Sequence, residues 1–104
     1  MKKNYRKFTQ LLDEYLKDEK LAAEFLSQAL EEEDFDTFLL SLKDIIRVHG
    51  SIKSIAEKCD ISRSTLYNLF SGKANPEMKT INTLLHAIGY ELKVTKRHQS
   101  EVAA

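Results

Sequence analysis

The residues with the clearest chemical capacity form a short polar segment in the second half of the chain. Between Ser62 and Ser71 the sequence reads Ser-Arg-Ser-Thr-Leu-Tyr-Asn-Leu-Phe-Ser. On a helix whose leucines turn inward, the outward face carries Ser62, Arg63, Ser64, Tyr67, Asn68 and Ser71. Arginine pairs bidentately with guanine and asparagine with adenine, while hydroxyl groups reach phosphates or base edges. No carboxylate lies on this face, so it predicts a helix that reads DNA; the alternative is a merely polar face toward solvent.

The longer segment 51–70 meets the packing requirements of a helix-turn-helix. Two helices that cross steeply over a short turn need a small residue at the crossing, which Ala56 supplies, and apolar inner faces. The inner faces would be formed by Ile52, Ile55, Cys59, Ile61, Leu66 and Leu69. The turn usually holds glycine because its backbone has a positive φ. Here it holds Asp60, one of the few side chains that tolerates this conformation.

The elements that must position this unit are helices. Apolar residues keep a helical period over most of the chain, which favours an all-α fold in a single domain. A stripe from Phe8 to Leu16 predicts a first helix, and Asp18 is suited to cap a second. The acidic run 31–34 would end the second helix and begin a third, which Gly50 ends. Ser51, Ser62 and the loop 72–76 would then begin three shorter helices, the last ending at Gly89.

After Gly89 the apolar period changes from 3.6 to 2, which predicts one short β-strand over 90–95. Tyr90, Leu92 and Val94 would face the helices, with Glu91 and Lys93 in solvent. A lone strand needs a partner from outside the chain, and we expect the same strand of a second copy, in a homodimer. An edge strand of another protein is the alternative. The predicted organisation is N-terminal helices 1–50, helix-turn-helix unit 51–89, strand 90–95 and tail 96–104.

Composition excludes several classes of protein. The 104 residues include a single cysteine, Cys59, so no disulfide can form within the chain, and we expect a buried thiol in a cytoplasmic protein. No apolar run suits a signal peptide or a membrane span. His49, His86 and His98 lack the spacing of a zinc site, and the paired carboxylates belong to charged helix faces. We therefore expect no metal, no cofactor and no enzymatic activity.

The charges are unevenly distributed along the chain. The formal net charge is zero, with sixteen basic and sixteen acidic residues. Residues 1–50 have eight basic and eleven acidic side chains, a balance of −3, and residues 51–104 have eight and five, a balance of +3. The second half is therefore where an anionic partner would bind.

Several motifs together resemble a known family, the addiction-module antidote proteins, which are HigA-type antitoxins of the Xre/Cro helix-turn-helix superfamily. The resemblance covers residues 13–94. Its motifs are Tyr15-Leu-Lys-Asp, Phe25-Leu26, Ala29-Leu30-Glu31-Glu32, Asp34, Phe38-Leu39, Ile55-Ala56-Glu57, Ser62-Arg63-Ser64-Thr65-Leu66-Tyr67, Asn75-Pro76 and Leu85-His86-Ala87-Ile88-Gly89-Tyr90-Glu91-Leu92. Asp60 in place of glycine departs from the pattern, and the basic start Lys2, Lys3, Arg6 and Lys7 lies outside it.

The resemblance implies a dimer that binds its own double-stranded operator DNA and neutralises a small RelE-like ribonuclease toxin encoded beside it. The helix that enters the major groove would present Ser62, Arg63, Ser64, Tyr67 and Asn68, and Lys73 and Thr80 match positions near the DNA backbone. Two alternatives stay open on the sequence. One is a free-standing Cro-like or prophage regulator without a toxin partner, and the other is an all-α protein-interaction module.

Overall fold

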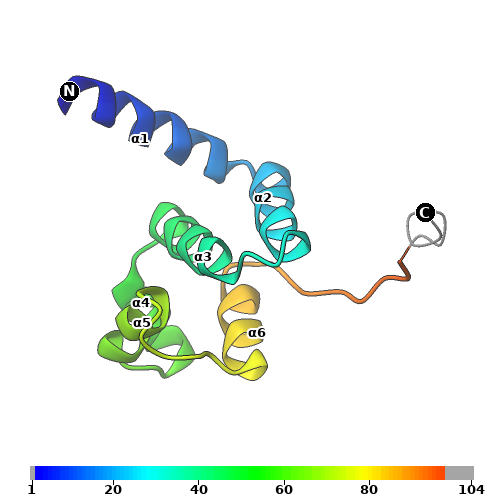
Figure 1. Cartoon of the computed structure of the whole chain (residues 1–104). Helices are drawn as coiled ribbons and strands as arrows, with labels where there is room; N and C mark the ends of the chain where they lie inside the picture. The colour runs from blue at the N-terminus through cyan, green and yellow to red at the C-terminus, as the bar shows by residue number, and fades with distance from the viewer. Residues whose placement is uncertain (1, 98–104) are drawn as a thin grey trace.

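A computed structural model of the chain describes residues 2–97, with side chains from Lys7 onward. Within this range the chain is all-helical, as predicted (Figure 1). The elements are α1 (Lys2–Lys17), α2 (Glu19–Glu31), α3 (Phe35–His49), α4 (Ile52–Cys59), α5 (Arg63–Phe70) and α6 (Met78–Ala87).

Side-chain caps set the helix boundaries where the sequence predicts them. The Asp18 carboxylate accepts from the backbone N–H groups of Lys20 and Leu21 at the start of α2. Asp34 accepts from the N–H of Thr37 at the start of α3, so the acidic run does separate these helices. Ser51 and Ser62 cap α4 and α5, and Ser51 forms a reciprocal capping box with Ser54. Each cap satisfies donors that a helix N-terminus leaves unpaired.

Helix α3 lies at the centre of the fold and packs against four other helices. Helices α1 and α2 lie on one side of it, and α4 and α5 pack against it from the other, while α6 packs on α4. The α3 side chains of Leu42, Ile45 and Ile46 have no exposed surface. The two halves of the chain therefore share one hydrophobic core.

An ion pair ties α1 to α3. The guanidinium of Arg47 donates to the Asp13 carboxylate through two nitrogens, Nη1 to Oδ2 at 3.2 Å and Nη2 to Oδ1 at 2.7 Å. This hydrogen bonding, together with the positive charge of Arg47, lowers the pKa of Asp13. Leu16, one turn further along α1, is buried in the core. The C-terminal half of α1 is thus fixed to the body of the protein.

The turn between α4 and α5 has the backbone conformation that the sequence indicated. Asp60 has φ 57° and ψ 44°, in the left-handed region. The N–H of Ile61 donates to the carbonyl of Ala56 at 2.9 Å, which closes the end of α4. Glu33, between α2 and α3, has the same positive φ of 57°.

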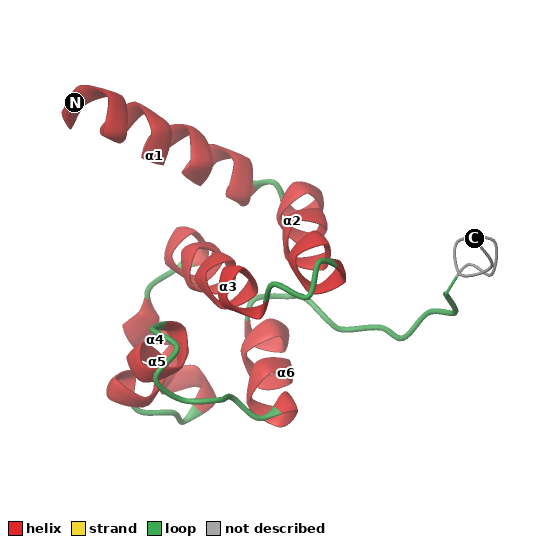
Figure 2. Cartoon of the chain, in the orientation of Figure 1, coloured by secondary structure: helices red, strands yellow, loops and turns green. Residues whose placement is uncertain are grey.

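The predicted strand over 90–95 is wrong. Among the described residues none is in a strand, and the chain after α6 runs out past α2 as an extended segment (Figure 2). The period-2 pattern correctly indicated extended backbone, but no second strand is available to form the ladder. Tyr90 is half-buried, and its hydroxyl donates to the Glu19 carbonyl at 3.4 Å. Tyr90 therefore packs on the helices as expected, whereas Leu92 is only partly covered and Val94 is fully exposed, so the expected packing of Val94 is wrong. Most of the predicted tail, 98–104 with His98, lies outside the described residues.

Over the described part of the chain, no helix has both the length and the apolar character needed to cross a membrane.

We expect the left-handed turn to control stability in a graded way. Asp60→Gly should raise the free energy of unfolding by about 0.5–1 kcal/mol, because glycine adopts positive φ without a steric penalty. Asp60→Ala should lower it by roughly 1 kcal/mol, because the alanine Cβ is disfavoured in this region. Urea denaturation followed by circular dichroism measures both changes. Equal stability of the two variants would contradict a left-handed conformation at this residue.

The α1–α3 ion pair predicts a pH-dependent stability difference. A carboxylate whose folded-state pKa is lowered stabilises the fold above its unfolded pKa of about 3.9, and this stabilisation is lost as the pH falls through the folded value. Because both groups are partly exposed, Arg47→Met should cost only about 0.2–1 kcal/mol at pH 7. The difference from the wild type should shrink in acid. A difference that persists at pH 2 would assign it to lost packing of the arginine stem instead.

Candidate nucleic-acid interface

The α4–α5 pair is held by the inward-facing residues that the sequence singled out. Ala56 is buried at the crossing, and Ile55, Leu66 and Leu69 are buried beside it. Ile52, Cys59 and Ile61 are half-buried at the edge of the same core. The pair packs on α3 through α5 and on α6 through α4. Its outer surface is therefore presented by a rigid support.

The predicted DNA-reading residues lie together on the exposed side of α5. Ser62, Arg63, Ser64, Tyr67 and Asn68 are all exposed. Half of the Tyr67 surface is accessible although its neighbours Leu66 and Leu69 are buried, which confirms the inward and outward faces of this helix. No acidic residue occurs between Ser62 and Ser71. This face offers hydrogen-bond donors and one full positive charge.

Ser62 has a structural task as well as an exposed position. Its oxygen accepts from the N–H of Thr65 at 3.1 Å, and its hydroxyl donates to the Thr65 side chain at 2.7 Å. The hydroxyl hydrogen is therefore directed toward the helix rather than outward. The N-terminus of α5, which Ser62 caps, is therefore exposed at the surface, and a helix N-terminus favours binding of an anion.

Lys73 and Thr80 lie apart from the α5 face. Lys73 is exposed in the loop after α5, where its N–H donates to the Asn68 carbonyl at 3.0 Å. This bond fixes the loop backbone directly beside the end of α5. Thr80 lies in the first turn of α6 and is half-buried, so it is the least accessible of the predicted contacts.

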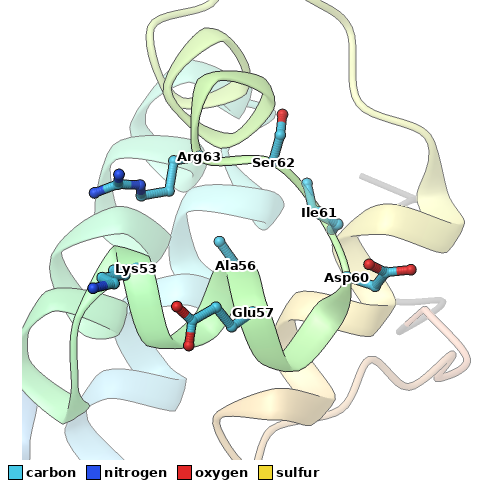
Figure 3. A pocket seen from close by; sticks show the side chains of 7 residues that line it. All are labelled: Lys53, Ala56, Glu57, Asp60, Ile61, Ser62 and Arg63. Carbon is cyan, nitrogen blue, oxygen red and sulfur yellow. The ribbon is translucent and has the colours of Figure 1, made fainter.

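A cleft of about 440 Å³ lies between α4 and the start of α5 (Figure 3). Figure 3 shows the charged ends of Arg63 and Lys53 on the same side of this cleft, with Glu57 below them and Asp60 at the other end. Sequence reasoning missed Lys53 and Glu57, although both are exposed residues of α4. The sequence did contain this signal, because Lys53 and Glu57 are four positions apart and therefore share one helix face. Two cations and two carboxylates border the cleft, so its own charge is balanced.

Cys59, the last residue of α4, has the surroundings of a structural rather than a reactive cysteine. The Cys59 Sγ lies 3.9 Å from the Thr83 carbonyl of α6, and burial raises the pKa of the thiol. A thiol with a raised pKa is poorly nucleophilic near neutral pH. The neighbouring Lys58 Nζ donates to the Ala87 carbonyl at 3.1 Å. Both contacts attach α4 to α6. In the described range no three His, Cys, Asp or Glu side chains are grouped closely enough to hold a metal ion.

Comparison with known proteins places this arrangement in a family. Residues 5–96 match the model of a family described as probable addiction module antidote protein. The chain belongs to this family of antidote proteins. A protein of Haemophilus influenzae, described only as uncharacterized, is 31% identical over 81 residues, which are 78% of this chain and 82% of that protein. No solved structure matches the chain.

Family membership gives the antidote protein the antitoxin role in a toxin–antitoxin pair, with a toxin as its general partner. The match spans all six helices from within α1 to the extended segment after α6. The N-terminal helices, the α4–α5 pair and the extended segment are therefore all parts of the family pattern.

Proposed function

We propose that this antitoxin represses its own operon by binding operator DNA through α5, and that it neutralises a RelE-like toxin. The single observation that carries the DNA-binding part is the outer face of α5, where Arg63, Tyr67 and Asn68 stand exposed on a helix fixed from behind. The short α4, the turn at Asp60 and α5 have the order and lengths of a helix-turn-helix. In such a motif the second helix enters the major groove.

The charges around α5 support duplex DNA over other ligands. Arg63 is suited to the guanine edge and Asn68 to adenine. The capped N-terminus of α5 favours a phosphate, and Lys73, held next to the end of α5, is suited to the same strand. A face that binds another protein can carry carboxylates, whereas a face that binds DNA is favoured by their absence, as on α5.

The proposal includes a homodimer. One α5 helix can read only one half-site, and specific operators commonly have two half-sites about 34 Å apart. A second copy supplies the second helix, and its binding becomes intramolecular, so the overall affinity exceeds that of one helix alone. In this mode the protein is a binding protein without catalytic activity.

The first test separates base recognition from phosphate binding. Arg63→Ala should weaken binding to DNA from the protein's own promoter by about 1–3 kcal/mol and relax the base preference at one position per half-site. Lys73→Ala should weaken all sequences alike and reduce the salt slope by about one for each copy bound. Fluorescence anisotropy on promoter and scrambled duplexes at several salt concentrations measures both, with Lys20→Ala on α2 as the control. Equal losses on both duplexes for Arg63→Ala would overturn the base-reading role.

The second test concerns the toxin. The product of the neighbouring open reading frame, expressed alone, should arrest growth and cleave RNA, and coexpression with this protein should restore growth. Arg63→Ala should restore growth as well as the wild type does, because α5 is assigned to DNA. If Arg63→Ala lost the protection while remaining folded, the toxin and the operator would share one surface. A neighbouring product without ribonuclease activity would remove the RelE-like assignment.

A further inference from the structure

An apolar groove of about 540 Å³ is lined by none of the residues of the α5 face. It is bordered by the end of α2, the start of α3, the start of α6 and the extended segment after α6. Large apolar side chains stand open in it, among them Met78, which is 71% exposed, and Val94, which is fully exposed. Leu30, Phe35 and Leu92 are also partly accessible there. Apolar surface of this kind on a small domain indicates a binding surface.

Charged residues lie at two places around the groove: Lys93 of the extended segment lines it, and an acidic run lies at its α2–α3 end. Leu30 and Phe35 flank the acidic run Glu31 to Asp34, and Asp36 follows. These carboxylates are exposed, and among the described residues no basic side chain forms an ion pair with any of them. The segment that fits such a groove has apolar side chains on one face and basic side chains beside them.

Helix α1 of this chain has that character. Phe8 and Leu11 are 64% and 65% exposed, and Tyr15, which is also exposed, continues the same helix face. Their spacing of three and seven residues is that of the anchors of a helix bound in a groove. The same helix carries Lys2, Lys3, Arg6 and Lys7, and residues 1–12 have a charge of +4, with four basic residues and no acidic ones.

The arrangement of the helices makes this contact intermolecular. In Figure 1 the N-terminal half of α1 extends past the other helices on one side, while the groove elements lie on the opposite side. The ion pair between Asp13 and Arg47 and the buried Leu16 hold α1 in this orientation. A chain therefore presents its α1 away from its own groove.

We propose that the N-terminal half of α1 docks into the groove of a second copy, and that the reciprocal contact closes a two-fold dimer. Phe8 and Leu11 contact the side chains of Leu30, Met78 and Val94 of the other copy, and Lys7 lies beside its acidic run at the α2–α3 junction. Two such contacts related by symmetry give a closed assembly rather than a filament. The inference rests on the homodimer of the proposed function and on neither DNA nor toxin.

A mixing experiment distinguishes this contact between two different surfaces from dimers in which α1 contacts α1 or the groove contacts the groove. Phe8→Asp damages α1, and Val94→Asp damages the groove; both residues are exposed, so folding should be preserved and circular dichroism checks it. Each variant alone loses both contacts, and its dimer Kd in sedimentation equilibrium should rise by at least about tenfold. In an equimolar mixture the intact α1 of one variant meets the intact groove of the other. One of the two contacts is restored, and a heterodimer should form.

Leu40→Asp is the matched control, because Leu40 is an exposed apolar residue of α3 outside both surfaces and should leave the dimer unchanged. Single variants that dissociate without any recovery on mixing would overturn the α1-in-groove contact while leaving the homodimer intact. A wild-type monomer at all concentrations would overturn the homodimer with it. Undisturbed dimers in both variants, with loss of growth protection only in Val94→Asp, would assign the groove to the toxin. Operator binding by the wild type, measured separately, decides the DNA-binding proposal whatever the dimer result.

Discussion

Burial of α3 is the constraint on which the rest of this antidote protein depends. Leu42, Ile45 and Ile46 have no exposed surface, and helices from both halves of the chain cover them. A helix buried on several sides is positioned by all its neighbours at once. The orientation of the α5 face, which we propose binds DNA, and the position of the groove at the start of α3 are therefore fixed by the same core.

The same core keeps opposite charges apart. The acidic junction between α2 and α3 and the carboxylate-free face of α5 belong to different sides of the fold (Figure 1). Duplex DNA strongly repels uncompensated carboxylates, so an acidic surface next to α5 would reduce both affinity and the rate of association. A chain with zero net charge thus presents a carboxylate-free face on α5, and the nearest carboxylates are those of Glu57 and Asp60 at the cleft beside it. The net charge of zero did not indicate this separation of charges, whereas the difference in charge between residues 1–50 and 51–104 did.

Local chemistry explains what could be predicted from sequence. Asp18, Asp34, Ser51 and Ser62 begin helices because their side chains reach N–H groups two or three residues away, a contact that depends on nothing else in the fold. The left-handed Asp60 followed in the same way from the turn it occupies. The inward Leu66 and Leu69 and the outward Arg63 followed from helical periodicity. These features include nearly all of the candidate DNA interface.

Features that depend on distant segments could not be predicted in this way. The alternation of apolar and polar residues over 90–95 correctly indicated extended backbone. A β-strand also requires a second strand to pair with, and Tyr90 instead contacts the start of α2. The groove joins residues as distant in sequence as Leu30 and Val94, so no pattern within one window reveals it. The position of Lys53 beside Arg63 was also missed, because it depends on how the turn orients α4 against α5.

The positions of the two surfaces also suggest how partner binding and DNA binding would be coupled. Helix α1 and the groove are both attached to α3, and α3 supports α5. A dimer formed through α1 and the groove would therefore set the separation and tilt of its two α5 helices without a flexible connection. Operator affinity in such a dimer depends on that separation, because both half-sites must be engaged at once. A toxin that competes for the groove would release the second copy and lower operator affinity, whereas a toxin bound elsewhere would leave repression intact.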